Sequence, residues 1–108
     1  MKKLYFLLLS FLLLTRFAAL GQNDLCTGAI NINCGQTITG TTVGATLDAV
    51  GTCITALNTA PGVWYSFTGD GLLNTLSLCG SGYDTKIGIF SGTCAALVCV
   101  AGNDETCD

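Results

Sequence analysis

The sequence is 108 residues long, carries a formal net charge of −3 and contains 7 cysteines but no histidine. This length allows one small domain with a limited core. A protein that binds a phosphate backbone needs clustered Lys and Arg side chains, and the chain has only 4 cations against 7 acidic residues. Nucleic acid is therefore excluded as a partner, and an anionic membrane surface is disfavoured for the same reason.

Residues 1–21 have the pattern of a secretory signal peptide. Two lysines follow the first residue, Leu4–Leu14 is an apolar run, and Ala19-Leu20-Gly21 has the small-x-small pattern of a cleavage site. The apolar run is too short for a membrane-spanning helix, which needs roughly 20 residues. We predict cleavage after Gly21 and an exported domain over residues 22–108. The product is expected to be secreted or held at the cell surface, without stable insertion into the membrane.

Removal of the signal peptide would make the chain more acidic. Lys2, Lys3 and Arg16 lie within it, so the exported domain keeps Lys86 as its only cation against seven acidic residues, a net charge of −6. A cation or a neutral ligand such as a sugar stays compatible with this charge.

The cysteines are expected to form disulfides. Zinc sites need Cys-x-x-Cys pairs or histidines, and the sequence has neither. Disulfides stabilise small exported domains whose cores are limited. Six cysteines allow many pairings, and the one suggested by the spacing is Cys26–Cys34, Cys53–Cys79 and Cys94–Cys99, with Cys107 unpaired. An odd cysteine suggests either a longer protein that continues beyond Asp108 or an intermolecular bridge through Cys107.

Turn signals recur about every ten residues and separate short segments rich in Thr, Val, Ile, Phe and Tyr, which predicts an all-β sandwich or barrel. Asp70-Gly71 has the chemistry of a tight turn, so the segments on either side of it are expected to pair. Residues 45–60 have no strong pattern and are expected to include a long loop. The expected strands are Ala29–Ile32, Gln36–Val43, Val63–Thr68, Leu72–Cys79, Lys86–Phe90 and Leu97–Ala101.

The sequence predicts no catalytic residues and hence no enzyme. Without histidine, Ser-His-Asp and Cys-His arrangements cannot form. Lys86 is interpreted as a solvated strand residue rather than a base. Asp84 and Asp104 could form the carboxylate pair of a glycosidase, but no aromatic set that would form a cleft accompanies them.

Two acidic loops, 82–85 and 102–108, carry the oxygen ligands that Ca²⁺ prefers. If they meet at one end of the sandwich, they form a candidate calcium site made of Asp84, Asn103, Asp104 and Asp108. The alternative is that Asn and Asp serve only as turn residues. No other cofactor is expected.

Trp64 is the aromatic side chain most suited to a ligand, because strand alternation places it on the face opposite Tyr65 and Phe67. Stacking on a sugar is one interpretation of these aromatic residues, and packing in the core is the other.

Three segments in order, Pro61–Phe67, Asp84–Cys94 and Leu97–Asp104, resemble a jelly-roll β-sandwich module repeated in large exported bacterial proteins. The module is similar to the bacterial pre-peptidase C-terminal domain, and its proteins often carry a sorting domain for type IX secretion. The resemblance spans residues 24–108. It implies further strands beyond the turn at Asn103-Asp104.

The resemblance also implies a non-catalytic accessory, binding or structural module of a larger secreted or cell-surface protein. Its partners would be other domains of that protein and a glycan or protein ligand. One alternative is a calcium-dependent glycan-binding module. Another is a fragment of a secreted hydrolase whose catalytic domain lies outside this chain.

Overall fold

The computed structural model describes residues 23–105, a part of the chain that is rich in strands and almost free of helix. This composition is compatible with the expected all-β class. The predicted signal peptide, its predicted cleavage site, Cys107 and Asp108 fall outside the described residues. The elements are the 3-10 turn η1 (Cys26–Gly28), β1 (Ile30–Asn31), β2 (Thr52–Cys53), β3 (Thr55–Ala56), β4 (Tyr65–Ser66), β5 (Ile87–Thr93) and β6 (Ala96–Asn103).

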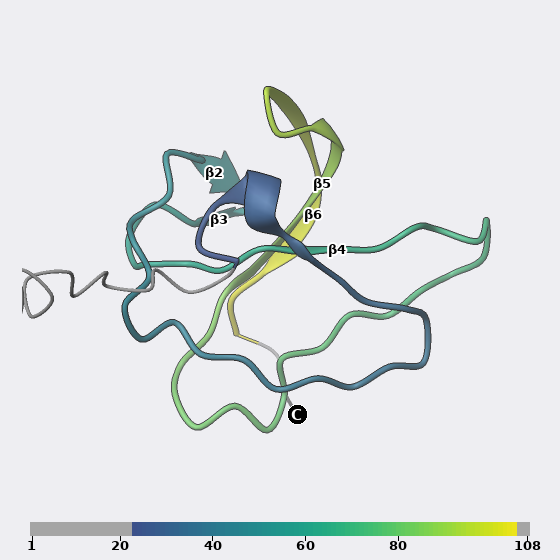
Figure 1. The fold of residues 1–108 in the computed structure, drawn as a ribbon, viewed down its shortest axis with the longest axis horizontal. Helices are drawn as coiled ribbons and strands as arrows, with labels where there is room; N and C mark the ends of the chain where they lie inside the picture. Colours follow the sequence, from purple (N-terminus) through teal and green to yellow (C-terminus); the bar gives the residue numbers. More distant parts are fainter. Residues whose placement is uncertain (1–22, 106–108) are drawn as a thin grey trace, which may run out of the picture.

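The largest element is the antiparallel hairpin of β5 and β6, which confirms two of the expected strands. Its register runs from Ile87 opposite Asn103 to Thr93 opposite Ala96. A β-bulge shifts the register between Ile89 and Phe90. In Figure 1 the turn of this hairpin lies at the top of the view, and a disulfide joins Cys94 in the turn to Cys26 in η1.

One face of the hairpin is covered by side chains from the preceding segments. The rings of Trp64 and Phe90 lie 6.1 Å apart and are tilted by 39°. A Cβ atom at Gly88 would clash with the Leu57 side chain, and one at Gly102 would clash with the carbonyl oxygen of Cys53. The two glycines therefore permit the close approach of the neighbouring chain that forms this covered face.

The other sheets are short, and a sandwich of two packed sheets is not seen. The described residues form three two-stranded sheets. β1 pairs with β4 in parallel, and β2 pairs with β3 in antiparallel fashion. Ile54 lies between β2 and β3 with φ of 65°, a value that β-branched residues rarely adopt.

The predicted hairpin around Asp70-Gly71 was wrong. Of Val63–Thr68 only Tyr65–Ser66 is a strand, and it pairs with β1 instead. Residues 72–79 and 36–43 form loops, and residues 45–60 contain β2 and β3 as well as loop. The physical reason is the lack of a surface to pack against, because Leu72 and Leu73 are 76% and 98% exposed.

The expected disulfide pairs were also wrong. Cys26 is bonded to Cys94 and Cys53 to Cys99, so each bond joins an early segment to the β5–β6 hairpin. Cys79 is disulfide-bonded as well, but not to Cys53. Cys34, expected in a bond, is a free and exposed thiol. The cysteine spacing suggested bonds that close short loops, whereas the observed bonds join segments far apart in the sequence. Disulfides of this kind fit an oxidising compartment.

Little of the described chain is fully buried. Cys53 is the only buried apolar residue, and Asn23 and Asp24 are the buried polar ones among residues 23–105. Twelve large apolar side chains are exposed, among them Val98 at 62% and Val100 at 60% on β6. Within the same range, no helix is long and apolar enough to cross a membrane.

Candidate functional site

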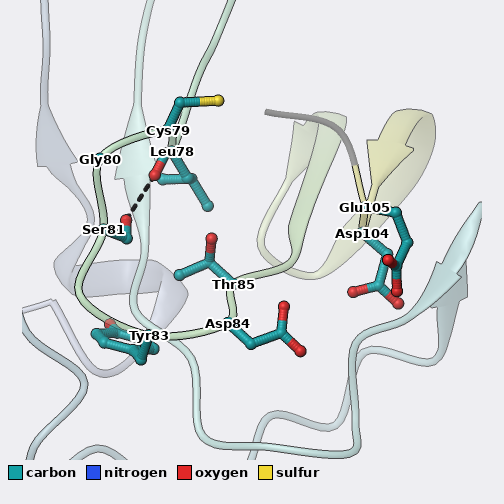
Figure 2. Close-up of a pocket in the computed structure, with 9 residues that line it drawn as sticks. All are labelled: Leu78, Cys79, Gly80, Ser81, Tyr83, Asp84, Thr85, Asp104 and Glu105. Atoms are coloured by element: carbon teal, nitrogen blue, oxygen red, sulfur yellow. Dashed lines mark hydrogen bonds between the residues drawn. The ribbon is translucent and has the colours of Figure 1, made fainter. Parts of the chain in front are cut away.

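An open pocket lies where β5 begins and β6 ends. Its volume is about 260 Å³. The lining comes from the loop before β5 and from the two residues that follow β6. Figure 2 shows the carboxylates of Asp84, Asp104 and Glu105 pointing into the space between these two segments. The lining residues are Leu78, Cys79, Gly80, Ser81, Tyr83, Asp84, Thr85, Asp104 and Glu105.

The chain folds locally to hold these groups in place. The Ser81 hydroxyl donates a hydrogen bond of 2.6 Å to the carbonyl oxygen of Leu78, and the Ser81 backbone N–H donates to the same oxygen at 3.1 Å. This closes the turn before Tyr83. After β6, the side-chain oxygen of Asn103 accepts a hydrogen bond of 2.9 Å from the Glu105 backbone N–H, which fixes the other wall.

Asp104 is already engaged by two neighbours. Its Oδ2 lies 3.0 Å from Lys86 Nζ and accepts a hydrogen bond of 3.2 Å from the Thr55 hydroxyl. Both charged side chains are partly shielded, with 34% of Lys86 and 27% of Asp104 exposed. Because Lys86 is the only cation among residues 23–105, Asp84 and Glu105 are left without a cationic partner in that range.

The structure brings together two of the four candidate calcium ligands. Asp84 and Asp104 face the same pocket, Asn103 precedes it as the last residue of β6, and Asp108 lies outside the described residues. In the described part of the chain, no group of three or more His, Cys, Asp or Glu side chains is arranged to hold a metal ion. The arrangement is an acidic pocket with a net negative charge, beside the exposed ring of Tyr83.

Trp64 lies on the covered face of the hairpin rather than in the pocket. Its Nε1 donates a hydrogen bond of 2.7 Å to Asp48 Oδ1, and its ring packs against Phe90. The side chain is half-buried. Its polar atom is thus occupied and its ring is used in packing.

Two hydrogen bonds from neighbouring residues shift the titration of Asp70. The Asn74 side chain donates to Asp70 Oδ1 at 3.0 Å, and the Leu72 backbone N–H donates to the same oxygen at 3.0 Å. These bonds, first that of Asn74 and then that of Leu72, hold the pKa of Asp70 below its ordinary value. They favour the ionised form.

We expect Asn74→Ala to raise the pKa of Asp70 toward the ordinary value of an aspartate, as followed by NMR titration of the carboxyl carbon. A depressed pKa in the folded state contributes stability above the unfolded pKa and loses it as the pH falls through the folded value. Asn58→Ala, at an exposed turn position, is the control. An unchanged titration of Asp70 in Asn74→Ala would contradict the assignment.

Sequence reasoning missed the buried polar anchor at the start of the described chain. Asp24 is 2% exposed. It accepts hydrogen bonds of 2.6 Å from the Thr46 backbone N–H and 2.9 Å from the Thr46 hydroxyl. Asn23 exchanges two hydrogen bonds with the backbone of Trp64, at 2.8 and 3.1 Å. No local pattern announces these bonds, since the partners lie 22 and 41 positions away in the sequence.

Comparison with known proteins found no match: no family model, no curated protein and no solved structure matches the chain. The function must therefore be argued from the residues and contacts described above.

Proposed function

We propose that the chain is an exported, non-catalytic β module that acts by binding another polypeptide, as a part of a larger secreted or cell-surface bacterial protein. The observation that carries the proposal is the exposed apolar surface of β6. Val98 and Val100 are 62% and 60% exposed on a strand with no charged residue. Exposed apolar patches on soluble domains commonly mark interaction sites.

Two further observations support a binding role over catalysis. The sequence contains no histidine, and the lysine and aspartate that share one edge of the pocket are bound to each other. The jelly-roll sandwich, the likeness to the pre-peptidase C-terminal domain and export by a type IX system belong to this proposal as its finer expectations. The long-range disulfides support its exported location.

A calcium-dependent glycan-binding module is the second candidate. The acidic pocket favours it, because Tyr83 is 56% exposed next to Asp84 and an exposed ring beside oxygen ligands suits a sugar. The engagement of Asp104 by Lys86 and Thr55 weighs against it, because a metal would have to compete with both.

We expect the full chain, produced with its disulfides, to associate with itself or with apolar surfaces through β6 when no partner is present. The double variant Val98→Lys, Val100→Lys should weaken this association at least about tenfold, since charged side chains on an edge strand oppose pairing. Sedimentation velocity over a concentration series measures the association, and binding of an apolar dye reports the exposed surface.

Leu73→Lys is the matched control, because Leu73 is 98% exposed on a loop away from the hairpin. Wild-type protein that stays monomeric at all concentrations, melts cooperatively and binds no dye would overturn the proposal. A rise in the melting temperature with millimolar Ca²⁺, without any change in association, would favour the glycan-binding candidate.

A further inference from the structure

In the described part of the chain, the outer edge of β6 has no strand partner. Among the described residues β6 pairs only with β5, and no other backbone hydrogen bond in that range involves a residue of β6. An edge strand in this state presents a row of free N–H and C=O groups to which a second extended chain can pair. Five of the eight residues of β6 are exposed.

This edge has little of the protection that natural proteins give to their edge strands. Charged side chains, proline and bulges are the usual devices against unwanted pairing. The sequence from Ile87 to Asn103 contains neither a charged residue nor a proline. Of these features, the hairpin has only the β-bulge, at the register shift between Ile89 and Phe90. The edge therefore suits an apolar extended segment, with Val98 and Val100 beside it.

The acidic pocket adds a charge requirement to the apolar, extended character expected of the partner. It begins at the residue that follows β6, so a chain lying along the outer edge of β6 would place one of its ends beside Glu105, and Asp84 lies across β6, before β5. These two carboxylates have no cationic partner among residues 23–105, where the only cation, Lys86, is bound to Asp104. Charge complementarity calls for a basic group at that end of the partner.

A second copy of the described chain fits this requirement poorly. Its only cation is Lys86, and pairing Lys86 with Glu105 of another copy would leave Asp104 without its ion pair. A foreign segment with a free Lys or Arg satisfies the pocket without this cost. The charge pattern thus distinguishes a heterologous partner from self-association.

We propose that β6 binds an extended, apolar segment of another polypeptide by strand addition, and that a Lys or Arg side chain at one end of this segment enters the pocket between Asp84 and Glu105. This inference rests on the proposed function, because it names the chemistry of the partner for the same hairpin. The apolar strand supplies burial at Val98 and Val100, and the basic end sets the direction in which the segment lies.

The probe is a short labelled peptide of alternating valine and threonine with one lysine at its end, and its affinity for the full chain is measured by fluorescence anisotropy. We expect binding that weakens about tenfold in Val98→Lys and, separately, in the double variant Asp84→Asn, Glu105→Gln. A tenfold change is the loss of one good interface contact. Leu73→Lys should bind as the wild type does.

Hydrogen exchange provides the structural readout. Strand addition should slow exchange at alternate amides of β6, whereas docking on a side-chain face would leave those amides unchanged and overturn the mode of binding. A peptide ending in glutamate that binds equally well would overturn the role of the pocket but leave the proposed function intact.

The remaining outcomes separate the inference from the proposed function. If no peptide binds while the wild-type chain still associates through Val98 and Val100, the occupant is a second copy and the inference is wrong. If no peptide binds and the chain is a monomer that takes up no apolar dye, both the inference and the proposed function fail.

Discussion

Removal of the Cys53–Cys99 disulfide is expected to lower the free energy of unfolding by about 4 kcal/mol or more, and by more than removal of Cys26–Cys94 does. A domain of this size has a total stability of only about 5–10 kcal/mol. The double variant Cys53→Ala, Cys99→Ala should therefore be largely unfolded at physiological temperature.

The two bonds differ in burial more than in loop length. They span 46 and 68 residues, and the loop-closure entropy predicts about 4 kcal/mol for each, with slightly more for the longer loop. Cys53, however, is the single fully buried side chain among residues 23–105. Its sulfur lies 3.1 Å from the Ala101 carbonyl oxygen and 3.6 Å from that of Ile89. Its loss therefore removes packing against both strands of the hairpin as well as a crosslink.

The measurement is chemical denaturation of the two double variants, both made in a Cys34→Ser background so that the free thiol cannot exchange with the disulfides. Cys26→Ala, Cys94→Ala is the matched control, because Cys26 is half-buried and Cys94 is exposed. A larger loss in the control would show that loop entropy outweighs burial, and the packing argument for Cys53 would then be wrong.

The hairpin of β5 and β6 could be predicted because its signals are local. Alternation of apolar residues marks Lys86–Phe90, a continuous apolar run marks Leu97–Ala101, and the turn residues lie between them. The two strands therefore meet with little loop entropy. The structure extends both strands toward the turn. The candidate pocket follows from the same local order, because Asp84 precedes β5 and Asp104 follows β6. Two strands that pair as a hairpin must bring those residues to one end.

The rest depends on contacts between distant segments. Leu76 and Leu78 alternate with polar residues as the apolar residues of Lys86–Phe90 do, but Leu72 and Leu73 find no layer to cover them, and residues 72–79 form a loop. The disulfides follow the chain path, and the path places Cys26 and Cys53 against the hairpin rather than near Cys34 and Cys79. Spacing alone contains no information about such a path.

The sequence also could not show the hydrogen bonds of the buried Asp24, because they join distant segments. Substitution of Asp24 is expected to have the second large effect on stability. We expect Asp24→Asn to lower the free energy of unfolding by about 2 kcal/mol, because hydrogen bonds to a charged group contribute about 1.5–3 kcal/mol each. The asparagine keeps the shape. Its Oδ1 can accept from the Thr46 backbone N–H and its NH₂ group can donate to the Thr46 hydroxyl oxygen, but both bonds lose the contribution of the carboxylate charge. Relief of the burial of an unpaired charge offsets a part of this loss.

Asp48→Asn is the matched control for this substitution. Asp48 accepts its bond from Trp64 Nε1 through Oδ1 alone, and an asparagine oxygen can take that bond, so the expected loss is below about 1 kcal/mol. Thr46→Val tests the donor side of the same contact, since it removes the hydroxyl that lies 2.9 Å from Asp24 Oδ2 and keeps the backbone N–H that donates to Oδ1. Chemical denaturation of the three variants measures the differences.

If Asp24→Asn were as stable as the wild type, desolvation of the carboxylate would outweigh its two hydrogen bonds. The expected result is the opposite, because both oxygens of Asp24 have donors within 2.9 Å and the residue lies beside Asn23, whose two bonds to Trp64 hold the same stretch of chain. Loss of the anchor would free the segment that covers the hairpin at Phe90. The module would then expose apolar surface on its covered face as well as along β6.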